Sequence, residues 1–182
     1  MDKEVASSVS NGQSFNSQTH GKVNIEEVIL IIKDFLEEEP DSEYSLVIGT
    51  DSHEKKMADS PKPANGTKTI SLVTAVLVHR KGFGGKYFWI RNEMSNIHNL
   101  REKIYAETLA SLNFAITFVP LLKKTLNGKA PNYNLEIHVD VGEHGDTRDM
   151  IKEVVGMVTG NGFVAKTKPY AYAASYVADK HT

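Results

Sequence analysis

The chain has 182 residues, which suits one domain with a full hydrophobic core and is short for two. Hydrophobic residues make up 40% and charged residues 24% of the sequence, so a largely disordered or fibrous chain is excluded. The absence of cysteine excludes disulfides, thiolate metal ligands and a cysteine nucleophile. The formal net charge of -2 gives no overall attraction to phosphate, so binding to nucleic acid cannot be argued from charge.

Residues 1–21 are polar, rich in serine, asparagine and glutamine, and without periodicity. A signal peptide would be apolar here, and no apolar run approaches the roughly 18 residues needed to span a bilayer, so we expect a cytoplasmic protein. We predict a flexible N-terminal arm over residues 1–22 and one folded domain over residues 23–182.

The first part of the predicted domain is a helix followed by three strands. Asn24 and Glu27 have the spacing of a capping box, and apolar residues then recur at helical spacing until residues 37–40. Apolar or β-branched segments separated by a proline-containing loop and a glycine turn predict an antiparallel meander. Its strands are residues 44–51, 69–79 and 87–90.

The second part of the predicted domain alternates helices with strands. We predict a long helix over 99–124, a strand over 135–141, a helix over 147–158, a strand over 163–168 and a helix over 169–180. Three strands followed by this alternation indicate an α/β fold. The expected sheet is mixed and five-stranded, with three antiparallel strands, then parallel strands, and helices on both faces.

Two aspartates follow apolar strands. Asp51 lies where the run from Tyr44 ends, and Asp140 has the same place on the run from Leu135. Ligand sites in open α/β sheets gather beyond the carboxyl ends of strands, and a buried carboxylate must be paired, protonated or bound to a cation. Taken singly, each aspartate could equally cap a turn. The repeated placement favours a shared site with a lysine partner or a cation.

Two further acids are expected on helices. Glu107 shares the apolar stripe of the long helix with Ile104, and that stripe should face the sheet. A carboxylate there indicates either a functional role or a buried ion pair with lysine or arginine. Asp179 shares a face of the last predicted helix with Tyr172 and is the fourth candidate, the alternative being a solvated acid near the C-terminus.

Four converging carboxylates suit Mg²⁺ or Mn²⁺, which prefer oxygen ligands and water. Two such ions about 4 Å apart can activate a water molecule and stabilise the leaving oxygen of a phosphodiester. We therefore predict Asp51, Glu107, Asp140 and Asp179 as metal ligands and catalytic residues of a metal-dependent nuclease. This chemistry needs no histidine or cysteine.

Four groups of motifs occur in order along the chain. They are Val47-Ile48-Gly49-Thr50-Asp51-Ser52; His138-Val139-Asp140-Val141-Gly142 with Gly145 and Thr147-Arg148; Gly156-Met157 with Gly160-Asn161-Gly162-Phe163; and Ala173-Ala174-Ser175 with Val177-Ala178-Asp179. Together they resemble the YkuK-type bacterial family, which is predicted to be ribonuclease H-like. The resemblance covers about Asn24 to the C-terminus.

The resemblance implies a ribonuclease H-like fold that hydrolyses RNA or DNA with two metal ions. In that superfamily the acids lie on the first strand, the first long helix, the fourth strand and the last helix. The positions that match here are Asp51, Glu107, Asp140 and Asp179. One local departure is His53, where a glutamine is expected in many relatives. The same fold hosts ATPases and inactive binding domains, so it does not by itself establish catalysis.

Histidines offer another kind of metal site. His138 and Asp140 are two residues apart on a predicted strand and so share a face, and His144 follows in the loop. A satisfied core residue is the simpler interpretation of His138, and a proton shuttle or phosphate contact at the rim is that of His144. A role for His181, two residues after Asp179, is left open.

Basic, aromatic and glycine residues are further candidates for contacts with nucleic acid. Two loops are flanked by Lys55, Lys56, Lys62, Lys68, Arg80, Lys81 and Lys86, for which a solvated surface is favoured over a phosphate contact. Tyr87, Phe88 and Trp89 include both faces of one strand, so at least one ring should be core. Gly49 and Gly142 are interpreted as close-packing or turn residues.

The predicted partner is nucleic acid, whether RNA, DNA or a hybrid, and no membrane is expected. Two other functions stay open. A non-catalytic nucleic-acid or protein-binding module on the same fold predicts acids that bind no metal or pair with lysines. An ATP or phosphoester hydrolase predicts turnover of nucleotides or small phosphate esters while polynucleotides stay intact.

Overall fold

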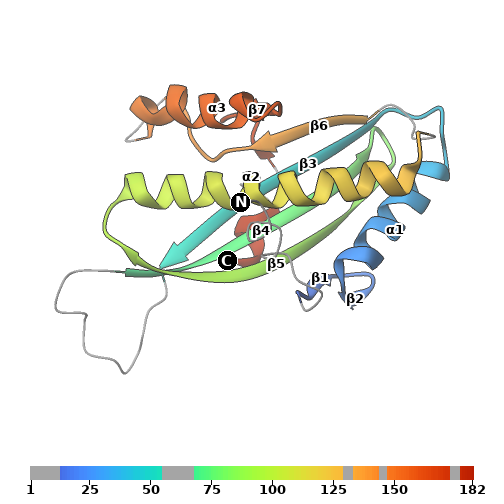
Figure 1. The fold of residues 1–182 in the computed structure, drawn as a ribbon, viewed down its shortest axis with the longest axis horizontal. Helices are drawn as coiled ribbons and strands as arrows, with labels where there is room; N and C mark the ends of the chain where they lie inside the picture. Colours follow the sequence, from blue (N-terminus) through green and yellow to red (C-terminus); the bar gives the residue numbers. More distant parts are fainter. Residues whose placement is uncertain (1–12, 55–67, 129–132, 144–146, 173–176) are drawn as a thin grey trace, which may run out of the picture.

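A computed structural model describes residues 13–54, 68–128, 133–143, 147–172 and 177–182. Three helices, α1 (Ile25–Glu37), α2 (Leu100–Leu126) and α3 (Ile151–Gly160), pack on one face of a sheet (Figure 1). The other face carries the C-terminal residues, which include a 3-10 helix, η4 (Asp179–His181), and a fully buried Ala178. Both faces of the sheet are therefore covered, as predicted, and within the described residues α1, α2 and α3 share one face.

The described part of the chain forms one mixed sheet of seven strands. They are β1 (Phe15–Ser17), β2 (Gly21–Val23), β3 (Tyr44–Glu54), β4 (Lys68–Arg80), β5 (Gly84–Ile97), β6 (Tyr133–His138) and β7 (Val164–Lys166). Their order across the sheet is β2-β1-β5-β4-β3-β6-β7. The meander β3-β4-β5 is antiparallel, while β6 pairs parallel to β3 and β7 parallel to β6. The predicted mixed α/β sheet is confirmed.

The count of five strands is wrong, because β1 and β2 extend the sheet beyond β5. Phe15 is only 1% exposed, and its ring lies 5.7 Å from that of Phe114 on α2. Residues 15–17 and 21–22 of the predicted arm are parts of β1 and β2, and residues 1–12 lie outside the described residues. Three-residue strands in a polar sequence are too short to show an alternating pattern.

Capping side chains fix where two of the helices begin. Asn24 and Glu27 form the predicted capping box at α1, with backbone-to-side-chain distances of 2.7 and 2.9 Å. Asn99 accepts a hydrogen bond from the backbone N–H of Glu102 at the start of α2. At the other end of α2, Asn127 is left-handed with φ 47°, which ends the helix. Local sequence thus sets the ends of α2, the helix that carries Glu107.

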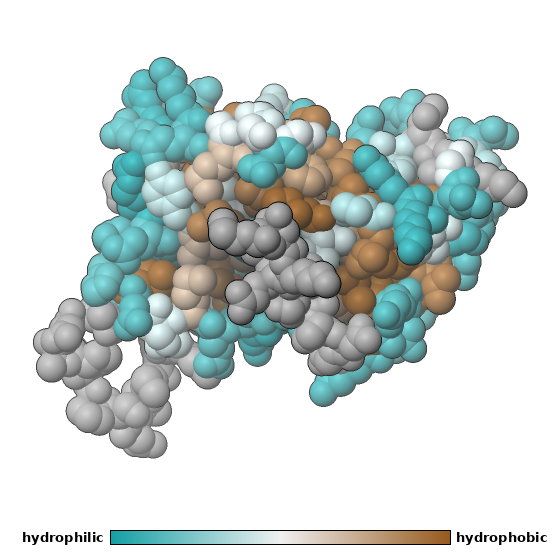
Figure 2. Space-filling model, viewed as in Figure 1, coloured by the Kyte–Doolittle hydropathy of each residue, from teal (hydrophilic) through white to brown (hydrophobic). Residues whose placement is uncertain are grey.

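Helix α2 is long and apolar enough, by length and composition alone, to cross a membrane. In the fold, 56% of its most apolar stretch is buried, because the helix packs on the sheet between α1 and α3. Its exposed large apolar residues are Leu100, Leu109, Ile116 and Leu121. Figure 2 shows apolar patches on this face, interrupted by polar side chains. The burial is that of a core helix.

The C-terminal third differs in detail from the prediction. The helix predicted over 147–158 is a 3-10 turn, η2 (Arg148–Met150), followed by α3. The helix predicted over 169–180 does not begin at Pro169, because residues 168–170 form a turn, and part of it lies outside the described residues. Its last residues, Asp179–His181, are a 3-10 helix.

Candidate functional site

Asp51 lies where strand β3 loses one of its two neighbours. The last parallel pair between β3 and β6 is Gly49 with His138, whereas β3 continues to pair with β4 as far as Glu54. The prediction that Asp51 ends its strand is therefore wrong: β4 continues the pairing, and only the β6 side is open. Asp51 thus sits at an opening in the sheet edge, beyond the carboxyl end of β6.

Asp140 follows β6 by two residues and stays beside β7. The backbone N–H of Val139 donates to Lys166 O at 2.9 Å, and that of Lys168 donates to Val141 O at 2.8 Å. Gly49 opposite His138 is the last pair, and the charge of Asp140 acts on Asp51, so the two aspartates lie near each other just past this pair. Side chains alternate along a strand, so both carboxylates belong to the sheet face that carries the C-terminal residues.

The pKa of Asp51 is raised, chiefly by burial and further by the negative charges of Asp140 and Asp179. The backbone N–H of Ser52 and the charge of Lys103 act in the opposite direction. These electrostatic interactions show that the three aspartates share one neighbourhood. In the sequence, even the nearest two, Asp140 and Asp179, are 39 positions apart. Repulsion among them favours an added cation.

Asp179 is exposed and is held in place by its neighbours in the C-terminal segment. Ala178 is buried in a small cluster with Val73 and Ala75. The His181 ring stacks on Trp89 of β5 with 3.7 Å between ring centroids, and Arg91 donates a hydrogen bond to the His181 carbonyl oxygen. The Asp179 backbone is thus anchored on both sides.

Glu107 approaches the same neighbourhood from the opposite face of the sheet. It is 3% exposed, and its Oε1 accepts a 2.7 Å hydrogen bond from Ser52 Oγ. Burial raises the pKa of Glu107 to about 7, with Ser52 and Lys103 opposing and Asp51 and Asp140 adding to the rise. Since Ser52 follows Asp51 directly on β3, the two residues point to opposite faces and connect both sides of the site.

Two lysines balance part of this negative charge. Lys168 Nζ lies 2.9 Å from Asp140 Oδ1, and Lys103 Nζ lies 3.5 Å from Glu107 Oε1. Neither lysine is among the residues predicted for the site. The ion pair of Lys103 could be predicted from the sequence, because Lys103 is four residues before Glu107 on one helix. The ion pair of Lys168 could not, because Lys168 is 28 residues from Asp140 in sequence and is brought near it by the β6-β7 pairing.

The donor chemistry of the four acids fits Mg²⁺ or Mn²⁺, since each offers carboxylate oxygens and Glu107 is a buried carboxylate whose ionised form needs a positive partner. Among the described residues, however, no three acidic or histidine side chains lie close enough together to hold one metal ion. The structure brings the predicted acids into one neighbourhood without gathering them into a single coordination shell.

None of the described histidines joins the acids in a group that could hold a metal ion. His138 is 1% exposed, with Nε2 3.2 Å from Glu136 Oε2 and its ring edge against Tyr172, as expected of a satisfied core histidine. Burial lowers the pKa of His138. His53 is exposed on β3, and His144 lies outside the described residues.

Most of the basic side chains that flank the two loops have partners within the protein. Lys68 pairs with Glu54, Lys81 with Glu43 and Arg80 with Glu38, while Lys86 lies over the Phe35 ring; Lys55, Lys56 and Lys62 lie outside the described residues. Phe88 is a fully buried core residue, as predicted for one ring of its strand. Tyr87 and Trp89 lie on the other sheet face, against His181.

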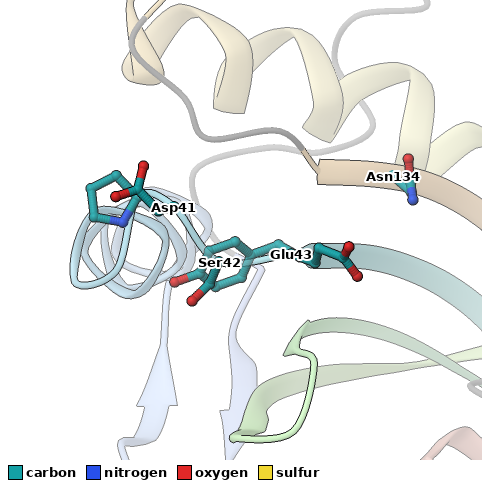
Figure 3. Close-up of a pocket in the computed structure, with 6 residues that line it drawn as sticks. Asp41, Ser42, Glu43 and Asn134 are labelled. Carbon is teal, nitrogen blue, oxygen red and sulfur yellow. The ribbon is translucent and has the colours of Figure 1, made fainter.

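A surface hollow of about 530 Å³ lies at the opposite end of the same strands. Figure 3 shows Glu43 at the start of β3 and Asn134 on β6, with Asp41 and Ser42 in the preceding loop. At about 3.3 Å per residue, the start of β3 is roughly 23 Å from Asp51. The hollow is therefore separate from the acids.

The mixed sheet, an antiparallel meander continued by parallel strands, is that of a ribonuclease H-like protein. The family model described as Ribonuclease H-like matches residues 27–182, so the chain belongs to this family. The chain is also 31% identical over 177 residues to the Bacillus subtilis (strain 168) protein called "Uncharacterized protein YkuK", with 92% of this chain and 96% of that protein covered. It is thus a member of the YkuK-type ribonuclease H-like family. No solved structure matches the chain significantly.

Proposed function

We propose that this protein is a metal-dependent nuclease that hydrolyses phosphodiester bonds in RNA or DNA by a two-metal mechanism, and that it acts in the cytoplasm. The observation that carries the proposal is the convergence of Asp51, Glu107, Asp140 and Asp179 from four separate elements of a ribonuclease H-like chain. A chain that only needed stability would gain little from placing these acids together, because like charges repel one another.

The proposed ligands have distinct roles. Asp51 and Asp140, side by side at the open edge of β3, are the central ligands of Mg²⁺ or Mn²⁺, and Glu107 and Asp179 support them from the two sheet faces. Ser52 fixes the orientation of the Glu107 carboxylate through its hydrogen bond. Glu107, with a pKa of about 7, would be able to hold a cation as a carboxylate at neutral pH. When bound, the metal ions would supply Lewis-acid stabilisation of a phosphoryl oxygen and activation of a water molecule.

The experiment is cleavage of labelled single-stranded, duplex, hybrid and branched oligonucleotides by the purified protein in Mg²⁺, Mn²⁺ or EDTA. Asp140→Asn keeps the side-chain shape and removes the charge, so it should abolish cleavage. Asp41→Asn is the matched control, because Asp41 is an exposed aspartate at the far hollow. Cleavage that needs no metal, or that survives Asp140→Asn, would refute the proposal.

One observation favours a second candidate, a non-catalytic binding module on the same fold. That function predicts acids paired with lysines, and Asp140 and Glu107 each have such a partner. The two candidates differ in metal binding: titration of the wild-type protein with Mn²⁺ should give a saturable heat change for a nuclease and none for the binding module. A binding module should still retain labelled oligonucleotides or a protein partner in EDTA.

A further inference from the structure

Lys168 is seated beside Asp140 by contacts along its whole length. Its backbone N–H donates to Val141 O at 2.8 Å. Its stem packs over Gly142, where an added Cβ would come within 3.2 Å of Lys168 Cβ. Its ammonium nitrogen lies 2.9 Å from Asp140 Oδ1. The backbone and stem thus fix the direction from which this positive charge reaches the carboxylate.

The ammonium group is nevertheless able to leave. The Lys168 side chain is 51% exposed and that of Asp140 24%, so water can solvate both groups if they separate. An exposed pair of this kind is worth only about 0.2–1 kcal/mol. A lysine with a flexible four-carbon stem can therefore swing away from Asp140 without disturbing the core.

A divalent ion and this ammonium group compete for the same carboxylate. Mg²⁺ ligated by a carboxylate sits about 2.0–2.1 Å from the oxygen, and an ion that close to Asp140 is repelled by the ammonium group 2.9 Å from Oδ1. Lys168 and Lys103 together face four carboxylates, so the site carries a net negative charge of two when all four acids are ionised. That residual charge attracts a divalent cation while Lys168 still opposes its approach to Asp140.

We infer that Lys168 is an internal counter-ion that competes with the divalent metal for Asp140, so that metal binding requires the lysine to move away and Lys168 sets the metal affinity of the site. The inference rests on the proposed function for the identity of the ligands. It goes beyond that function, because it makes this lysine a control on how much free metal is needed to load the site.

A neighbouring lysine provides a matched control. Lys166 lies two residues earlier on β7, and its Nζ is 3.9 Å from Glu136 Oε1. Its side chain is 42% exposed, close to the value for Lys168. Lys166→Met thus removes the same charge from the same stretch of chain while the Lys168–Asp140 ion pair stays in place.

The test is isothermal titration of Mn²⁺ into the full chain, with wild type, Lys168→Met, Lys168→Arg and Lys166→Met compared at one low ionic strength. Loss of a pair worth about 0.2–1 kcal/mol corresponds to Mn²⁺ binding that is roughly 1.4- to fivefold tighter in Lys168→Met. Lys168→Arg should bind as wild type does, and Lys166→Met should change the affinity less than Lys168→Met. Circular dichroism and urea unfolding confirm that each variant is folded.

The outcomes separate this inference from the nuclease proposal. Tighter Mn²⁺ binding in Lys168→Met than in Lys166→Met supports the competition, even if no variant cleaves any oligonucleotide, in which case only the nuclease proposal falls. Binding that appears only when Lys168 is removed supports it as well. Equal Mn²⁺ affinity in the two methionine variants, or no Mn²⁺ binding in any variant, overturns it.

Discussion

Ser52 on β3 donates a 2.7 Å hydrogen bond to Glu107 on α2, and this bond holds the Glu107 carboxylate on the helix-covered face of the sheet at the candidate site. The residue before Ser52 is Asp51, whose side chain points to the opposite face. One dipeptide of β3 therefore supplies an acid on one face and holds an acid on the other. The strand, rather than any loop, sets the spacing between the carboxylates.

Glu107 should make stability depend on pH. Its pKa is 4.5 in an unstructured chain and about 7 in the folded protein, so the folded state binds more protons between these values. The free energy of unfolding should consequently fall as pH rises from about 4.5 to about 7 and then level off, by at most about 3 kcal/mol. Glu107→Gln, which is always neutral, should remove this fall.

Urea denaturation in EDTA at a series of pH values measures the effect. The variant and wild type should have similar stability near pH 4.5, and the variant should be more stable above pH 7. Glu39→Gln, at an exposed position after α1, should follow the wild-type curve. A wild-type stability that rises steadily across this window, in parallel with that of Glu107→Gln, would show that Glu107 is ionised throughout.

Lys103 should hold the pKa of Glu107 down. Its positive charge lies 3.5 Å from Glu107 Oε1 and lowers the pKa of both Glu107 and Asp51. In Lys103→Met the pKa of Glu107 should rise above about 7, which carbon-detected NMR titration of the labelled glutamate carboxyl groups would follow. Lys124→Met, near the far end of α2, should leave it unchanged. An unchanged Glu107 titration in Lys103→Met would contradict the interaction.

The elements predicted correctly are those whose own residues determine them. The capping box of Asn24 and Glu27 sets the start of α1, and the apolar runs and turns of residues 44–97 specify the antiparallel meander. The positions of Asp51 and Asp140 after apolar residues were enough to predict that the two would approach each other, because parallel neighbours bring their carboxyl ends to one edge.

What escaped prediction depends on partners distant in sequence. Phe15 belongs to the core because Phe114 lies beside it, and no local pattern around residue 15 encodes that contact. The extra length of β3 past Asp51 comes from pairing with β4, in a polar stretch that reads as the end of a strand. The Lys168 pair with Asp140 arises from the β6-β7 crossover, so only the fold reveals that a lysine faces the acids.

Phe15 should be a large contributor to stability. A fully buried phenylalanine replaced by alanine costs about 3–5 kcal/mol, so Phe15→Ala should lower the free energy of unfolding in urea by an amount in that range. Lys22→Ala, on the neighbouring strand β2 and exposed, should change it by less than about 0.5 kcal/mol. Equal stability of Phe15→Ala and wild type would mean that β1 is not part of the cooperative core.

His181 should report on how the C-terminal segment is attached. The chain has one tryptophan, Trp89, so its fluorescence is free of other indole signals. The His181 ring covers Trp89 in a parallel stack, and its loss in His181→Ala should expose the indole to water and shift its emission to longer wavelength. The stack itself is worth about 0.5–1.5 kcal/mol of stability beyond buried area.

His181→Ala should also change the electrostatics of the acidic site, because η4 carries Asp179 as well as His181. If the segment loosens, Asp179 moves away and Asp51 becomes more hydrated, and both effects lower the raised pKa of Asp51. NMR titration of Asp51 in His181→Ala would measure that fall, with His98→Ala as an exposed-histidine control. A red-shifted Trp89 emission with an unmoved Asp51 titration would show that the aromatic stack anchors the C-terminus without placing Asp179 at the site.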